Sequence, residues 1–259
     1  MKKRIAKLYI LTIIVIILFI LTAWNCGRKE PTTAAPAPPV SSEMKPETFY
    51  SLTVSEPSGL VYNKHTNTLL TVSDSQPDIY EISLTGSTYG TIPANGTDME
   101  GVALSVTGDT LYFAEERIRR VSAITRSGSL LRSFTINAGS PGNSGLEGIT
   151  VNTATGHLYI INEKDPVMLF CYNDTTELWR KPLSFTSDIS GICYDETTGA
   201  LWIVSDESRK VLKLTLTGEL IASWNIPFSK GEGIAIAGDK IYIVNDQENR
   251  MYLFSKPVN

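Results

Sequence analysis

A unit that recurs five times along the chain is the strongest constraint on its fold. Each copy starts at a glycine followed by an aliphatic residue, and these glycines are Gly59, Gly101, Gly148, Gly191 and Gly233, separated by 42, 47, 43 and 42 residues. Each copy continues with an alternating strand, a polar turn and a second strand that ends in an acid, which is Asp74, Glu116, Glu163, Asp206 or Asp246. Self-similarity at a nearly fixed period indicates one supersecondary unit per repeat, so the repeat decides the architecture.

The fourth copy shows most clearly what one unit contains. Residues 190–226 read SGICYDETTGALWIVSDESRKVLKLTLTGELIASWNI, in which the turn signals DETTG, SDESR and TLTGE separate four short strands. This pattern predicts an antiparallel sheet of the size of a propeller blade. Helix signals are nearly absent after residue 30. We therefore predict an all-β fold, a five-bladed β-propeller of four-stranded antiparallel blades, over residues 47–259.

The two ends of the repeat region predict how the ring of blades closes. The fifth copy ends at Phe254 after only three strands, whereas residues 47–55 (ETFYSLTVS) form a strand that precedes the first copy. We expect this N-terminal strand to complete the last blade, because closure removes the open sheet edges that otherwise invite aggregation.

The N-terminal segment predicts export from the cytoplasm. Residues 1–7 (MKKRIAK) carry four positive charges and residues 8–24 are almost entirely apolar, so residues 1–26 are typical of a signal peptide or membrane anchor. Cys26 ends the sequence AWNC, which resembles a lipoprotein cleavage site; a lipoprotein and an uncleaved anchor are both open, with simple secretion as a third alternative. Residues 27–46 are rich in Pro, Ala and Thr and predict a disordered tether. We expect a cell-envelope location, with the propeller membrane-anchored and outside the cytoplasm, in the periplasm or at the cell surface.

The net charge of the chain excludes one class of partner. The formal net charge of −4 argues against nucleic-acid binding, because phosphate contacts need a basic face. We expect a monomer that contacts the membrane through its N-terminus and binds an unknown protein or small-molecule ligand.

Cys171 and Cys193 each lie in an apolar strand of a different blade, so we expect buried thiols rather than a disulfide.

The candidate site follows from the antiparallel order within each blade. The start of the first strand and the end of the second strand share one edge of the sheet, and the first strand lines the axis, so both should meet at one mouth of the central channel. Blades two, three and five place Glu100, Glu147 and Glu232 directly before the glycine. Blades one and four have Ser58 and Ser190 there instead. Two residues earlier lie further acids, which are Glu56, Asp98 and Asp188 in blades one, two and four.

So many carboxylates near one axis predict a cation site. They repel one another, and only Lys230 opposes their charge, so some must take up protons or share a cation. No histidine or cysteine lies there for zinc, and oxygen ligands with flexible geometry favour Ca²⁺ before Mg²⁺. The candidate ligands are Glu100, Glu147, Glu232, Glu56, Asp188, Glu163 and Asp206. A structural role stays open for each, above all for the acids that end the second strands, because such acids also bond the backbone N–H groups of turns.

The same face offers little for catalysis without a metal. The only histidines, His65 and His157, lie in turns between first and second strands, on the opposite face. A histidine general base at the acidic mouth is therefore excluded, and hydrolysis would need a metal-bound water with a carboxylate base. We name no catalytic residue. Three hypotheses stay open. The first is a calcium-binding propeller that acts as a binding or scaffold module, the second is a calcium-dependent hydrolase of the lactonase or phosphoesterase type, and the third is a propeller with no metal.

The repeat also carries a family resemblance. The run SGICYDETTGALWIVSDESRKVLKLTLTGE, together with EGV, EGI and EGIAIAGDKIYIVNDQENRMYLF, resembles the SdiA-regulated family of bacterial envelope proteins, which are related to NHL-repeat propellers. The resemblance covers residues 47–259 and implies a five-bladed propeller with a calcium site, but it implies no particular activity. Six-bladed relatives include metal-dependent lactonases and phosphoesterases with axial glutamate and asparagine ligands. By that analogy Glu100, Glu147 and Glu232 are the matching positions, and Ser58 and Ser190 depart from the pattern.

Overall fold

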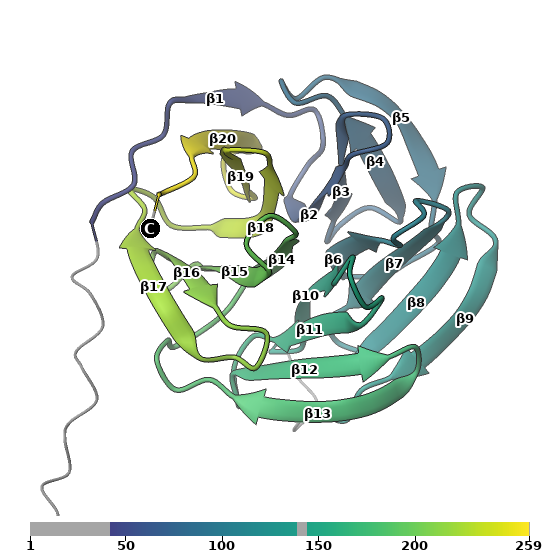
Figure 1. Ribbon diagram of the computed structural model, residues 1–259. Coiled ribbons are helices and arrows are strands. Elements are labelled where there is room, and N and C mark those ends of the chain that lie inside the picture. Colours follow the sequence, from purple (N-terminus) through teal and green to yellow (C-terminus); the bar gives the residue numbers. More distant parts are fainter. Residues whose placement is uncertain (1–41, 139–143, 259) are drawn as a thin grey trace, which may run out of the picture. The chain divides into compact units, whose positions relative to one another are not determined.

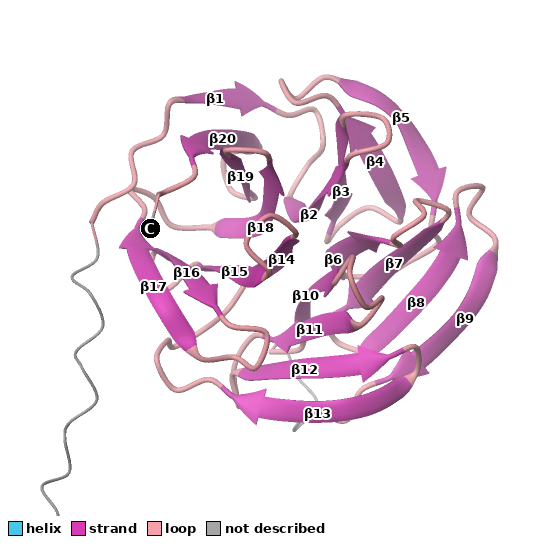
Figure 2. Cartoon of the chain, viewed as in Figure 1, coloured by secondary structure: helices cyan, strands magenta, loops and turns pink. Residues whose placement is uncertain are grey.

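Twenty strands make up the regular structure of the described part of the chain. The computed structural model describes residues 42–138 and 144–258, and these two ranges contain strands, turns and bends but no helix. The strands form five four-stranded sheets arranged around a central axis (Figures 1 and 2). The predicted five-bladed, all-β propeller is confirmed.

In blades one to four the strands run outward from the axis in chain order. Blade one contains β2 (Pro57–Asn63), β3 (Thr68–Ser73), β4 (Asp78–Ile82) and β5 (Thr88–Pro93). Blade two contains β6 (Met99–Leu104), β7 (Thr110–Glu115), β8 (Arg120–Thr125) and β9 (Leu130–Thr135). Blade three contains β10 (Leu146–Val151), β11 (Leu158–Asn162), β12 (Met168–Asn173) and β13 (Thr176–Pro182). Blade four contains β14 (Gly191–Asp195), β15 (Ala200–Ser205), β16 (Lys210–Leu214) and β17 (Leu220–Asn225).

The last blade is completed by the first strand of the chain, as predicted. It contains β18 (Gly231–Ala237), β19 (Lys240–Asn245), β20 (Arg250–Ser255) and β1 (Thr48–Ser51). Strand β1 pairs antiparallel with β20, with Thr48 opposite Leu253. The backbone N–H of Glu47 extends this pairing by donating to the Leu253 carbonyl at 2.8 Å. The ring of blades is thus closed by hydrogen bonds between the two ends of the propeller.

Residues just before β1 already pack on the propeller. Glu43 forms a parallel bridge with Asn225 at the outer edge of blade four, and the Met44 N–H donates to the Asn225 carbonyl at 2.8 Å. The Met44 side chain is buried in the same apolar cluster as Trp224. The sequence predicts a tether that ends at residue 46, whereas the packed part of the chain begins by residue 42, because one apolar side chain among polar neighbours finds a hydrophobic pocket. The predicted signal segment, Cys26 and the rest of the tether lie outside the described residues, as do residues 139–143.

Apolar side chains fill the space between neighbouring blades. One cluster joins Val72 and Ile79 of blade one to Val102 and Phe113 of blade two, and four further clusters join the other adjacent pairs. Because each sheet is covered on both faces, its inner strands are continuously buried, as in β15, whose six residues are all buried. Cys171 and Cys193 are buried free thiols, as predicted. Within the described residues, no helix is long and apolar enough to cross a membrane.

The recurring glycines occupy the places where the innermost strands come closest. A Cβ atom added to Gly59 would lie 2.7 Å from the Cα of Gly101, and one added to Gly101 would lie 2.8 Å from the Cα of Gly148. A Cβ on Gly191 would collide with the carbonyl of Glu232 in the next blade. Side chains at these positions would force the innermost strands apart, which explains why every copy of the repeat begins with glycine.

Replacing one axial glycine by alanine tests this explanation. The Gly101→Ala variant should lose about 1–3 kcal/mol of unfolding free energy or more, because its methyl group meets backbone atoms that cannot move aside. Gly90→Ala is the matched control, since Gly90 lies in the outer strand β5 with no atom within 4 Å of its added Cβ; its effect should stay within about 0.5 kcal/mol. Chemical unfolding of both variants provides the measurement, and equal stabilities would contradict the packing argument.

Candidate metal centre

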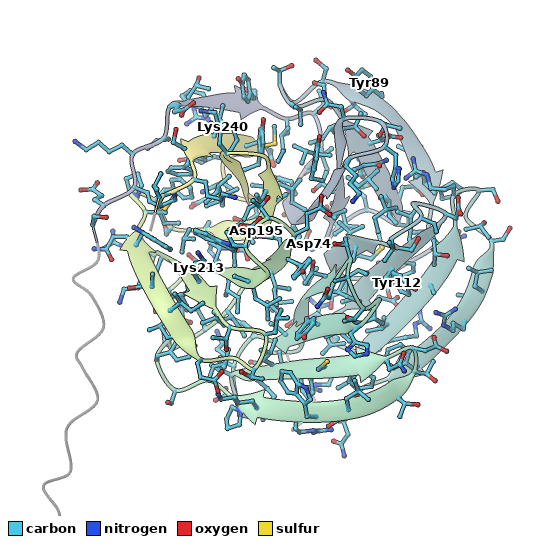
Figure 3. The ribbon with its side chains drawn as sticks, viewed as in Figure 1. Asp74, Tyr89, Tyr112, Asp195, Lys213 and Lys240 are labelled. Carbon is cyan, nitrogen blue, oxygen red and sulfur yellow. The ribbon has the colours of Figure 1, made fainter. Side chains whose placement is uncertain are left out.

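The predicted acidic mouth exists as a polar cavity of about 150 Å³ at one end of the axis. Figure 3 shows Asp74, one of its lining residues, close to the centre of the blades. Six of the seven predicted ligands line the cavity, and Asp188 is the exception. The lining residues are Glu56, Ser58, Asp74, Glu100, Glu147, Glu163, Ser190, Asp206, Lys230, Glu232 and Asp246.

Irregular strand starts aim the glutamates into this cavity. The sequence predicts that each first strand opens at its glycine, but β6 begins at Met99 and β10 at Leu146. The pairing register shifts between Met99 and Gly101 and between Leu146 and Gly148. Such a β-bulge sets two residues against one on the partner strand and turns a side chain away from its regular direction. Similar shifts occur in blades one and five, whereas β14 pairs regularly from its first residue.

The backbone just before the bulges adopts a left-handed conformation in three blades. Glu56, Asp98 and Lys230 each lie three residues before an axial glycine and have φ angles of 47°, 57° and 62°. Non-glycine residues rarely adopt this conformation, which persists only where surrounding contacts enforce it. At Glu56 one such contact is visible, because its N–H donates to the Asn249 Oδ1 atom at 2.9 Å. The chain therefore enters the mouth through the same tight bend in these blades.

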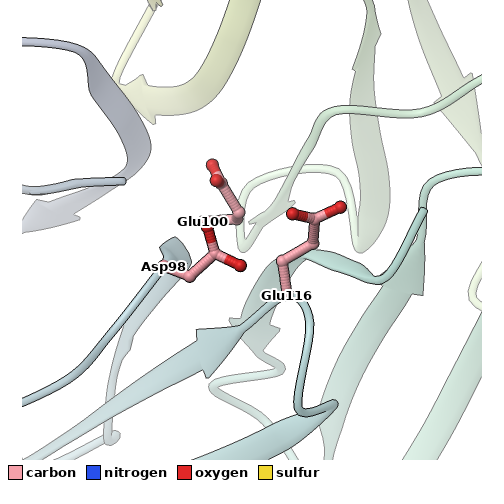
Figure 4. Close-up of side chains that lie close together, drawn as sticks. All are labelled: Asp98, Glu100 and Glu116. Carbon is pink, nitrogen blue, oxygen red and sulfur yellow. The ribbon is translucent and has the colours of Figure 1, made fainter. Parts of the chain in front are cut away.

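Two overlapping groups of carboxylates in blades two and three come close enough to share a cation. In residues 42–138 and 144–258, Asp98, Glu100 and Glu116 form one group, shown in Figure 4. Glu116, Glu147 and Glu163 form the other. Within each group the nearest carboxylate oxygens all lie within 4.8 Å of one another. Glu116 belongs to both groups, although neither Glu116 nor Asp98 lines the cavity itself.

Basic side chains pair with only some of the acids at the mouth. On the side of blades four and five, the Lys230 Nζ atom lies 3.1 Å from Asp206, and the Lys230 N–H also donates to that carboxylate. On the side of blades two and three, Arg117 contacts Asp98 at 3.3 Å and Lys164 contacts Glu163 at 2.8 Å, both on the rim. Three glutamates between them have no ion-pair partner among the described residues, and these are Glu100, Glu116 and Glu147.

Burial makes these acids hard to ionise. It raises the pKa of Glu100 and of Glu232 to about 8, with neighbouring acids adding to the effect. Glu147 is only 8 % exposed, and burial together with Glu100 and Glu232 raises its pKa well above the ordinary value. The Ser58 hydroxyl donates to the Glu100 carboxylate and partly offsets the rise. Burial also raises the pKa of Glu116. Without a cation, these glutamates therefore tend to hold protons near neutral pH.

Other predicted positions serve the turns rather than the cavity. Asp188 is buried and accepts hydrogen bonds from the Ser205 hydroxyl and from the Glu207 N–H. This is the structural role that the sequence leaves open for such acids. Asn162 and its counterpart Asn245 donate their side-chain NH2 groups to nearby backbone carbonyls. The Asn245 Oδ1 atom accepts from the Glu248 N–H at 2.9 Å, whereas the buried Asn162 Oδ1 atom has no hydrogen-bond partner among the described residues.

Two members of the carboxylate groups are not among the seven predicted ligands. Glu116 ends the second strand of blade two, and Asp98 precedes its first strand by the same offset as Glu56 in blade one. Both positions are visible in the repeat. The short distances between their carboxylate oxygens are not, because these depend on how the strand starts and strand ends come together in three dimensions.

Fold and cavity together define a five-bladed β-propeller with an acidic, partly buried pocket at one end of its axis. The family model described as SdiA-regulated matches residues 49–257, so the chain belongs to the SdiA-regulated family. The family resemblance inferred from the repeat is thereby confirmed.

Several solved structures share the fold at low sequence identity. Glutaminyl cyclase from Myxococcus xanthus aligns with a TM-score of 0.68 and 14% identity, covering 85% of this chain and 100% of that one. A chain of a nidogen/laminin complex aligns with a TM-score of 0.57 and 18% identity, covering 77% and 76%. A streptogramin B lyase aligns with a TM-score of 0.50 and 16% identity, covering 82% and 73%. At these identities the similarity establishes the fold alone.

The raised pKa values predict how the cation-free protein responds to pH. An acid whose pKa is higher in the folded than in the unfolded state binds more protons when folded, so stability falls as pH rises between the two values. We expect the Tm in a chelator to fall from about pH 5 to pH 8, by about 2–4 °C per kcal/mol lost.

Glu147→Gln should flatten this profile, because it removes one of the buried acids that must ionise. The control is Glu219→Gln, since Glu219 is exposed and hydrogen bonding to Lys181 lowers its pKa. Thermal unfolding at several pH values is the measurement. A Tm that rises steadily from pH 5 to pH 8 would contradict the account of the buried acids.

Proposed function

We propose that this chain is a membrane-tethered, extracytoplasmic propeller that binds Ca²⁺ at its acidic mouth and acts as a binding or scaffold module. The observation that supports the calcium site is the pair of carboxylate groups that share Glu116. Three of their glutamates have no basic partner among the described residues, and burial makes their joint ionisation costly. A divalent cation would supply the missing positive charge.

The chemistry of the lining residues favours Ca²⁺ over other divalent ions. Every acid and both serines of the cavity offer oxygen, and among the described residues neither histidine nor cysteine lines it. Ca²⁺ takes six to eight oxygen ligands in flexible geometry, whereas Mg²⁺ demands a near-ideal octahedron and Zn²⁺ favours nitrogen and sulfur. Carboxylates from two blades and water molecules in the open part of the cavity suit the larger, more adaptable ion.

The position of the ion follows from the distribution of charge. Asp98 and Glu163 already contact Arg117 and Lys164, so a cation gains most from the glutamates between them. Glu116 is the residue that both groups need. A cation bound here would also connect blades two and three at the axis, which makes the mouth a rigid surface for a partner.

The proposed location supports the choice of ion and of role. The positively charged, apolar N-terminal segment and the Pro-rich tether predict a domain held outside the cytoplasm. Extracellular calcium modules work with dissociation constants of about 10⁻⁴–10⁻³ M, so a site of moderate affinity would be occupied there. A tethered domain with a calcium-stiffened face is suited to binding a partner near the membrane.

Calcium titration of residues 42–259, which include every described strand, tests the proposal. After chelation, saturation at about 100 times the dissociation constant should add about 2.7 kcal/mol of stability, which is about 5–10 °C in Tm. Because the cation displaces protons, the affinity should rise from pH 6 to pH 8.5.

The variants Glu116→Gln and Glu147→Gln should each weaken calcium binding at least tenfold. Asp109→Asn is the matched control, because exposed Asp109 lies in the turn after β6, at the other end of blade two. Isothermal titration calorimetry at one pH compares the three variants. Unchanged calcium affinity in Glu116→Gln would rule out the proposed ligand set.

A hydrolase is the second candidate, and the open space of the cavity is the observation that favours it. About 150 Å³ beside the carboxylates would admit a small substrate next to a bound cation. The similar structures include a cyclase and a lyase as well as a chain from a nidogen/laminin complex, and propellers support both enzymes and binding modules. A screen of lactones and phosphoesters with and without Ca²⁺ separates the two. Calcium-dependent turnover that Glu147→Gln abolishes would replace the binding-module proposal with the hydrolase.

A further inference from the structure

The opposite end of the axis carries a second cavity, larger than the acidic one. Its volume is about 220 Å³, and its walls come from the far ends of the five innermost strands and the turns that follow them. We call this cavity the second mouth and define it by Tyr62, Lys64, Val106, Tyr194, Glu196 and Ile236, which lie in or after β2, β6, β14 and β18. Asp195, which also lines this cavity, lies near the centre of the blades in Figure 3.

The two cavities are separated by a solid plug. Between them the axial glycines and the aliphatic side chains that follow, including Leu60, Val102 and Ile149, leave essentially no free volume. A ligand in the second mouth therefore cannot touch the carboxylate groups. Whatever binds there is independent of the proposed calcium site.

An unequal set of turns opens the second mouth. In blades one and four, four residues separate β2 from β3 and β14 from β15, whereas Gly238 and Asp239 alone separate β18 from β19 in blade five. Blade five lies between blades one and four in the ring. The short turn leaves a gap in the rim between two longer turns.

One ion pair crosses this gap. The Lys64 Nζ atom of blade one lies 2.8 Å from the Glu196 Oε2 atom of blade four, and the Thr153 hydroxyl of blade three donates to the same oxygen at 3.2 Å. The two charged side chains are 46% and 51% exposed. Exposed ion pairs of this kind contribute about 0–1 kcal/mol. The pair can therefore open at little cost and offer one charge of each sign to a ligand.

The interior beneath the pair carries apolar and aromatic side chains, with some hydroxyl groups between them. Its lining includes Val61, Tyr62, Val151, Tyr194 and Ile236, and also Ser105, Thr150 and Thr197. The one buried acid nearby, Asp195, is neutralised, because Lys256 contacts it at 3.1 Å and Thr198 donates to it at 2.7 Å. His65 stands at the rim, where its backbone N–H donates to Asn63 at 3.1 Å. The second mouth thus combines an apolar floor with charges of both signs at its entrance.

From these features we propose that the second mouth binds a free aromatic α-amino acid. An apolar cavity of about 150 Å³ holds benzene, so 220 Å³ is sufficient for one ring with its first carbons and is small for larger ligands. Tyrosine rings and aliphatic side chains favour an aromatic body. The carboxylate of the ligand pairs with Lys64 in place of Glu196. Its ammonium group pairs with Glu196 in place of Lys64.

Calorimetric titration of residues 42–259 with three ligands that share one ring tests the proposal. L-Phenylalanine should bind most tightly, while 3-phenylpropanoate lacks the ammonium group and phenethylamine lacks the carboxylate, and each should bind at least tenfold more weakly. Glu196→Gln should weaken L-phenylalanine and leave 3-phenylpropanoate unchanged. Lys64→Met should weaken L-phenylalanine and leave phenethylamine unchanged. Equal affinity for all three ligands would overturn the assignment of the two charges.

Two further variants separate pocket binding from general effects. Val106→Trp should abolish binding by filling the entrance, and it is tolerated by the fold because Val106 is 40% exposed in a turn. Lys181→Met is the matched control, since it breaks an exposed ion pair of similar geometry away from the second mouth, between Lys181 of β13 and Glu219 just before β17, at 2.6 Å; binding should persist. No heat with millimolar L-phenylalanine, L-tyrosine or L-tryptophan, or undiminished binding in Val106→Trp, would overturn the proposal. Chelation should not alter the result, so the calcium proposal can fail separately.

Discussion

Backbone contact between the innermost strands is the constraint on which the rest of this structure depends. Around the axis Gly59, Gly101 and Gly148 approach one another so closely that a methyl group on one would reach the backbone of the next. This approach closes the channel with a dry plug and leaves a cavity at each end. It also brings the residues before the glycines, which are the bulged glutamates, within reach of one another. The acidic site is therefore a by-product of how tightly five strands can converge.

The sequence predicts the fold well because the repeat reports local structure directly. Strand alternation, turn residues and the spacing of the glycines depend on neighbours in the chain, and the missing fourth strand after Phe254 could be matched to residues 47–55. The sequence predicts which acids gather at the mouth for the same reason. It does not predict the distances between their carboxylate groups. The regular start of β14, where the other four first strands are bulged, and the pairing of Lys230 with Asp206 break the fivefold pattern.

The acidic site departs from the symmetry of the repeat. A symmetrical interpretation places a cation on the axis among Glu100, Glu147 and Glu232, whereas the structure gathers the closest carboxylates around Glu116, to one side. Lys230 occupies the other side. The short turn of blade five opens the second mouth in a comparable way, because it interrupts a rim that four longer turns would close. In both cavities the chemically distinctive feature lies where one blade departs from the others.

The path of the N-terminal segment has a mechanical consequence. The chain first pairs with blade four through Glu43 and Met44, and only then reaches β1, which closes blade five. A pull on the N-terminus is therefore borne first by the Met44–Asn225 hydrogen bond and by the buried Met44 side chain. These contacts therefore anchor the N-terminal segment to blade four, ahead of β1. Strand β1, which closes the ring, follows these contacts along the chain.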